Sequence, residues 1–163
     1  MMSHIEQGLK DDLTNLLDGC LRHLIAFGIV TEEQLRGRVR ILWKRASVLG
    51  HRGHGASTTQ DDAGKAVVYL DPSQQPQQLA WCIVHEATHV AQVCRGDLAF
   101  SREGIVWCGN RQVPCDAQDP AYKGQPWEIE AEEMVPRLIS ALRKSDPKLG
   151  PLLDVLEKHQ QSL

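Results

Sequence analysis

The residues best suited to chemistry in this sequence form one short segment, His85-Glu86-Ala87-Thr88-His89. On a helix, histidines four residues apart lie on one face with their rings one turn apart, so that two imidazole nitrogens can bind a single zinc ion. Glu86 then projects beside the metal, where it can act as the general base and then the general acid of a zinc-dependent hydrolysis. The alternative is a pair of structural histidines on a helix.

The residues around this segment indicate that it lies on a buried helix. Apolar side chains surround it at Leu79, Cys82, Ile83, Val84, Ala87, Val90 and Val93. Burying two imidazoles and a carboxylate costs free energy unless these groups are coordinated or hydrogen-bonded. The pattern therefore favours a metal site over coincidence.

A catalytic zinc site needs a third protein ligand. The metzincin extension of the motif has glycine at position 92 and histidine at position 95, but this chain has Gln92 and Arg95, which excludes that class. No histidine follows until His159, so we expect the third ligand to be a carboxylate. The best source is an acidic segment that begins a helix at Pro126-Trp127 and carries Glu128, Glu130, Glu132 and Glu133.

The segment from Pro126 to Glu132 resembles the E-x-E-A-D/E helix of gluzincin-type metallopeptidases, especially their minimal single-domain members. The resemblance covers mainly residues 65–135 and depends on this segment together with H-E-x-x-H. It implies that Glu128 completes the zinc site and that Glu132 makes a hydrogen bond to a ligating histidine. Because Glu stands where Asp is commoner at position 132, Glu132 remains the alternative third ligand.

Hydrophobic periodicity predicts both helices and strands in this chain. Spacings of three and four predict helices over residues 5–27, 76–95, from 126 onward and 152–158. Alternation predicts strands over residues 38–43 and 66–70, and a hairpin within residues 104–113 that turns at Gly109-Asn110. Residues 50–64 are expected to form a loop or an irregular hairpin, because Gly, Ser, Thr and Asp dominate them.

These elements predict an α+β fold in a single domain that spans residues 1–163. We expect a small, mainly antiparallel sheet packed on the H-E-x-x-H helix, with a second helix supplying the third zinc ligand, as in zincin-like proteins. A capping-box pair, Thr31 and Gln34, predicts a further helix start between the first helix and the first strand.

Composition and charge exclude several classes of protein. The chain has 163 residues, of which 42% are apolar and 24% charged, the profile of a globular domain. A net charge of -3 gives no reason to expect binding to nucleic acid or to an anionic membrane. No apolar run approaches the roughly 20 residues of a membrane span, and no signal peptide is recognisable. Five cysteines without a CxxC pair suit a reducing compartment, so we expect a cytoplasmic protein.

Together these features predict a zinc-dependent metalloprotease that hydrolyses peptide bonds through a zinc-activated water. We expect one Zn²⁺ per chain, held by His85, His89 and Glu128. Glu86 is the expected catalytic base, and Tyr122 is expected to donate a hydrogen bond to the tetrahedral intermediate.

The gluzincin resemblance also implies how a peptide or protein substrate binds. In that family an edge strand beside the active-site helix pairs with extended substrate, and here the corresponding strand is Ala66–Leu70. Two alternatives to a peptidase stay open. The first is a non-proteolytic, zinc-binding regulatory or phage-associated accessory domain of zincin fold. The second is a zinc-free structural protein.

Overall fold

Helix α4 (Pro76–Cys94) is the central element of the structure. From Leu79 to Cys94 every residue except Trp81 is buried, including the polar side chains of the H-E-x-x-H segment. A helix that is buried on all sides needs neighbours on all sides. The helix begins at a proline, which is favoured in a first turn. It ends before Gly96, whose φ of 89° is a left-handed conformation that glycine adopts without strain.

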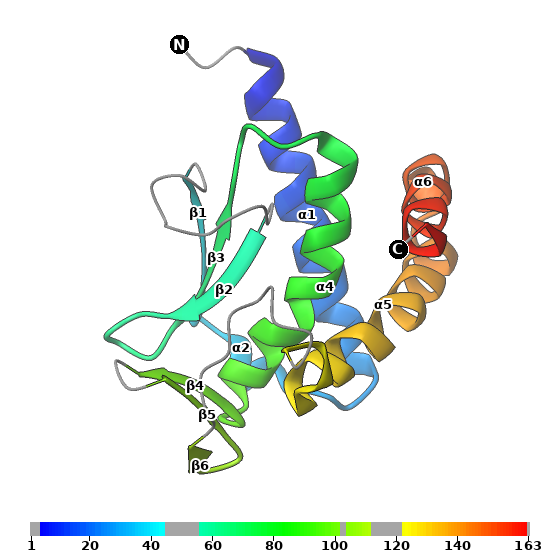
Figure 1. Ribbon diagram of the computed structural model, residues 1–163. Helices are drawn as coiled ribbons and strands as arrows, with labels where there is room; N and C mark the ends of the chain where they lie inside the picture. Colours follow the sequence, from blue (N-terminus) through cyan, green and yellow to red (C-terminus); the bar gives the residue numbers. More distant parts are fainter. Residues whose placement is uncertain (1–3, 45–55, 102–103, 112–121, 163) are drawn as a thin grey trace.

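The computed structural model describes residues 4–44, 56–101, 104–111 and 122–162. Within this part, α1 (His4–Ala26) runs beside α4, and a three-stranded sheet lies on one side of α4 (Figure 1). Helices α5 (Pro126–Ser145) and α6 (Gly150–Gln161) lie on the other side (Figure 1). The apolar faces of these helices and of the sheet share one hydrophobic core around α4.

The first sheet has the strand order β1-β3-β2. In it, β1 (Val39–Trp43) is parallel and β2 (Ala56–Gln60) antiparallel to β3 (Ala66–Leu70). All residues of β3 except Tyr69 are buried, as a continuous apolar run in a central strand requires. The prediction that this strand lies at a sheet edge is therefore wrong, because β1 and β2 occupy both of its edges. Instead, β2 is an edge strand of the sheet, and it contacts α4.

The second sheet is an antiparallel meander of β4 (Leu98–Ser101), β5 (Gly104–Trp107) and β6 (Asn110–Arg111). Neither β4 nor β2 was predicted as a strand from the sequence. Because β2 is rich in Ser and Thr, it lacks the apolar alternation of a half-buried strand. It lies within the segment expected to be a loop or irregular hairpin, and it forms a regular hairpin with β3.

The predicted hairpin between β5 and β6 is present, but its turn is one residue away from the predicted position. Trp107 pairs with Asn110, so the two turn residues are Cys108 and Gly109 rather than Gly109 and Asn110. Both have positive φ, 50° and 82°, the combination that a type I′ turn requires. The Asn-Gly preference of such turns misled the prediction, because the order here is Gly-Asn.

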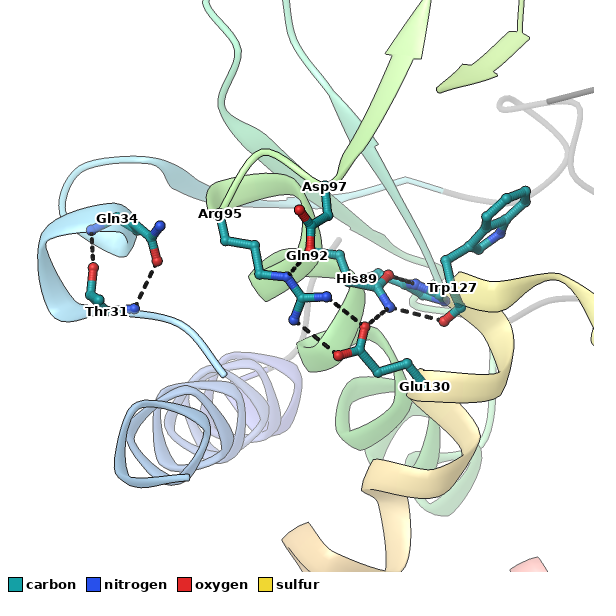
Figure 2. Close-up of polar contacts among 8 residues, drawn as sticks. All are labelled: Thr31, Gln34, His89, Gln92, Arg95, Asp97, Trp127 and Glu130. Carbon is teal, nitrogen blue, oxygen red and sulfur yellow. Dashed lines mark hydrogen bonds and ion pairs between the residues drawn. The ribbon is translucent and has the colours of Figure 1, made fainter. Parts of the chain in front are cut away.

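The fold is α+β, as predicted, with five helices and small, mostly antiparallel sheets among the described residues. The short helix α2 (Glu32–Leu35) begins with the predicted capping box (Figure 2). The Thr31 hydroxyl accepts from the Gln34 backbone at 3.1 Å, and the Gln34 side chain accepts from the Thr31 backbone at 2.9 Å. Among the helices that the structure describes, none is both long and apolar enough to cross a bilayer.

Candidate metal centre

His85 and His89 lie one turn apart on the same face of α4, as their spacing predicts. Their Nε2 atoms are 3.2 Å apart, and the two rings meet edge to face with centroids 5.0 Å apart. Both side chains are buried among the core residues of α4. Two ring nitrogens that face each other at this distance need a proton or a cation between them, because two lone pairs would repel.

Glu128 brings a carboxylate to the same point from α5. Its Oε1 is 3.0 Å from Nε2 of His89, and its Oε2 is 3.3 Å from Nε2 of His85. Glu128 is buried in the first turn of α5, where the helix dipole stabilises negative charge. The ligand atoms of the three residues all lie within 4.8 Å of one another. They form a buried His-His-Glu group that could hold a metal ion.

The three side chains shift one another's protonation. Burial by itself lowers the pKa of His89, but the hydrogen bond with Glu128 and the charges of Glu86 and Glu128 raise it to about 9. Burial raises the pKa of Glu128, but the hydrogen bonds and charges of the two histidines hold it well below its usual range. The Glu128 carboxylate thus favours a positive charge beside it, which a protonated His89 supplies. A divalent cation offers the same compensation.

The donor set of this group suits a transition metal ion, zinc among them. Two imidazole nitrogens and one carboxylate oxygen suit zinc, whereas magnesium and calcium prefer oxygen ligands throughout. Glu132 lies outside the group, and its Oε1 is 3.9 Å from Nδ1 of His85, beyond hydrogen-bond distance. Nδ1 of His85 is buried and has no hydrogen-bond partner among the described residues. The hydrogen bond predicted from Glu132 is thus not present in this structure.

Glu86 projects from α4 toward the first sheet. The Thr58 hydroxyl, on β2, donates a hydrogen bond of 2.5 Å to Oε2 of Glu86. The Glu86 side chain is buried, and its negative charge acts on His89, so it lies close to the His-His-Glu group without belonging to it. This is the position that a general base needs beside a metal site.

An aromatic side chain packs against the first histidine of the group. The Trp81 ring stacks on His85, with centroids 5.5 Å apart and planes 17° apart. His159 of α6 meets the same tryptophan edge-on at 5.7 Å, but it is not part of the His-His-Glu group. The stacking fixes the plane of the His85 ring, whose Nδ1 lacks a hydrogen bond within the described residues.

Sequence reasoning missed three polar residues that surround the group: Thr58, Gln92 and Arg95. Gln92 follows His89 by three residues on the same helix, a neighbour relation that could have pointed to it. Arg95 donates hydrogen bonds to both carboxylate oxygens of Glu130 on α5. Burial raises the pKa of Glu130, but the hydrogen bonds from Arg95 hold this pKa below its usual range. No local sequence pattern pointed to Thr58, because its contact with Glu86 joins residues 28 apart in the sequence and depends on the sheet.

Tyr122 was predicted to donate a hydrogen bond to a reaction intermediate. It begins the 3-10 helix η1 (Tyr122–Gly124), immediately before α5. Its side chain lies outside the described part of the chain, so its role stays a prediction.

Known proteins add no further constraint on this site. In comparisons with family models, curated proteins and solved structures, this chain matches none. The interpretation of the His-His-Glu group therefore depends on its residues, its geometry and the resemblance of its two motifs.

Proposed function

We propose that this chain is a zinc-dependent peptidase with a gluzincin-type, zincin-like site. The observation that carries the proposal is the convergence of His85, His89 and Glu128, with ligand atoms within 4.8 Å of one another. The two histidines come from one helix and the glutamate from the next, which is the arrangement that the two sequence motifs imply. Burying three titratable groups at one point costs free energy, and coordination of a cation by all three would offset that cost.

A zinc ion at this site would supply Lewis acidity, which polarises a carbonyl and makes water a nucleophile near neutral pH. Glu86 would accept the proton of the attacking water and deliver it to the leaving amine. The Thr58 hydroxyl already binds Oε2 of Glu86, so Oε1 would be the atom that accepts the proton. Tyr122 would donate to the developing oxyanion from the segment before α5.

The proposed substrate is an extended peptide or an unfolded segment of a protein. Among the described residues, β2 pairs as a strand with β3 alone, while β4 contacts it and the Phe100 backbone donates to the Gln60 side chain at its end. An added strand would therefore pair with β2 along the part of its other edge near Thr58. Because Thr58 on this strand contacts Glu86, a peptide paired with β2 would run beside the proposed base. Main-chain pairing of this kind gives little sequence selectivity by itself.

The first test is zinc content per chain, measured by elemental analysis of protein purified without an affinity tag. We expect one zinc ion in the wild type and a marked loss in Glu128→Ala. Glu133→Ala is the matched control, because it makes the same change at an exposed position of the same helix. A folded wild type without zinc would refute the metal site, and equal zinc in Glu128→Ala would refute its third ligand.

The second test separates a peptidase from a zinc-binding accessory domain. Glu86→Gln should keep its zinc and lose nearly all hydrolysis of a broad peptide and protein library, since the amide cannot accept the proton. Retained turnover in this variant would refute the mechanism. A zinc-loaded wild type that cleaves nothing in the library would instead favour a non-proteolytic zinc-binding domain.

A further inference from the structure

Gln92 is a fully buried polar residue beside the His-His-Glu group. It lies on α4 three residues after His89, and none of its surface is exposed. A buried amide is costly unless its donors and its acceptor are satisfied. The hydrogen bonds of Gln92 join His89 on one side and α5 on the other (Figure 2).

The contacts with α5 determine which way the amide points. Nε2 of Gln92 lies 3.0 Å from the carbonyl oxygen of Trp127 and 2.7 Å from Oε2 of Glu130. Both partners only accept hydrogen bonds, so they require the NH₂ group. Arg95 keeps the Glu130 carboxylate in place by donating to its two oxygens at 3.0 and 2.8 Å (Figure 2). The amide oxygen is therefore the atom that faces Nδ1 of His89, at 2.8 Å.

This orientation decides the protonation pattern of the histidine ring. An amide oxygen only accepts, so Nδ1 of His89 must carry a hydrogen. Nε2, across the ring, is then the atom that can offer a lone pair to a metal ion, and it is the atom that faces Glu128 and His85. We propose that Gln92 is a positioning residue for His89, which fixes its ring orientation and the Nδ1–H tautomer that can bind a metal. The inference rests on the proposed metal site and deepens it.

The same contacts explain why an amide rather than a carboxylate lies behind this histidine. A carboxylate often orients a metal-binding histidine in other sites. Here the Gln92→Glu substitution would place a second negative charge beside Glu130 and remove the hydrogen bond that Gln92 donates to the Trp127 carbonyl. Glutamine satisfies both sides, because it donates to α5 and accepts from His89. The Arg95–Glu130 ion pair anchors the α5 end of this chain of contacts.

The decisive variant is Gln92→Met, which keeps the length of the side chain and removes both its donor and its acceptor. Zinc affinity of the folded protein, measured by competition with a chromophoric chelator, should fall about 10- to 100-fold. Gln77→Met makes the same change at an exposed position of α4, and Leu24→Ala weakens the core from α1. Both controls should bind zinc as tightly as the wild type. Unchanged affinity in Gln92→Met would overturn the positioning role.

A second measurement uses only the wild type, so it tests the tautomer of His89 even if Gln92→Met does not fold. In the zinc-loaded wild type, long-range ¹H–¹⁵N correlations of the His89 ring should show a protonated Nδ1. A ring protonated at Nε2 would overturn the inference. A wild type that binds no zinc would overturn the metal site and the positioning role together, whereas zinc bound equally by wild type and Gln92→Met overturns the positioning role alone.

Discussion

Replacing Arg95 would show whether the ion pair behind the metal centre stabilises the fold. Arg95→Met keeps most of the apolar stem and removes the guanidinium, which donates to both oxygens of Glu130 and to Asp97 at 2.6 Å. The Arg95 side chain is 16% exposed and that of Glu130 is 25% exposed. The substitution therefore leaves a carboxylate that is largely shielded from water without its opposite charge.

The size of the loss in unfolding free energy depends on how far Glu130 is shielded from water. Removing one partner of a fully buried ion pair costs about 3–5 kcal/mol. Because Glu130 is partly solvated and still accepts from Gln92, we expect the lower figure of about 2–3 kcal/mol. In a chain of this size 1 kcal/mol corresponds to about 2–4 °C, so the melting temperature should fall by about 4–12 °C.

Urea unfolding followed by tryptophan fluorescence measures this cost, with EDTA present so that metal binding does not contribute. Arg143→Met is the matched control. Arg143 also contacts two carboxylates, Asp154 at 2.7 Å and Glu157 at 3.1 Å, but this cluster is exposed and screened by solvent. The free energy of unfolding should fall far more in Arg95→Met. Equal losses in the two variants would refute the reasoning.

The loss of stability caused by Arg95→Met should also depend on pH. Although burial raises the pKa of Glu130, hydrogen bonds from Arg95 and Gln92 hold it below its usual range. A carboxyl whose pKa is lower in the folded state contributes stability above its unfolded pKa of about 4.3, and this is lost as the pH falls through the folded value. Without Arg95, burial favours the protonated form. The stability difference between Arg95→Met and wild type should therefore be full at pH 7, begin to shrink at the raised Glu130 pKa of the variant, above about pH 4.3, and be lost as the pH falls through the lowered pKa of the wild type.

Three further predictions concern the metal centre itself. Thr58→Val should keep the zinc content and lower peptide hydrolysis about 10- to 100-fold, because Glu86 loses its orienting donor, whereas Thr59→Val on the same strand should change neither the zinc content nor hydrolysis. Tyr122→Phe should lower kcat about 100- to 1,000-fold with little change in KM if the hydroxyl stabilises the oxyanion; an unchanged kcat would remove Tyr122 from the mechanism. Free zinc at about 1,000 times its Kd should stabilise the wild type by about 4 kcal/mol, or about 8–16 °C in melting temperature. Scanning calorimetry with and without EDTA measures this shift, and a shift of equal size in Glu128→Ala would argue against the third ligand.

The sequence by itself determined the local part of the site. The spacing of His85 and His89 sets their common face once the segment is helical, and the apolar residues around them make the helix and its burial predictable. Strand Ala66–Leu70, the helix starts at Pro76 and Pro126, and the capping box at Thr31 are equally local, and the structure confirms them. Each depends on interactions within a few residues, which periodicity and capping preferences describe.

Only the tertiary structure decided which distant residues meet. Glu128 and Glu132 lie one turn apart on α5, and the packing of α5 on α4 brings the first to both histidines while the second stays mostly outside. Thr58 reaches Glu86 because β2 pairs with β3 against α4, and no local pattern marks β2 as a strand. The amide of Gln92 is oriented by acceptors 35 and 38 residues away. Contacts of this kind depend on how elements pack, which the period of a single element does not encode.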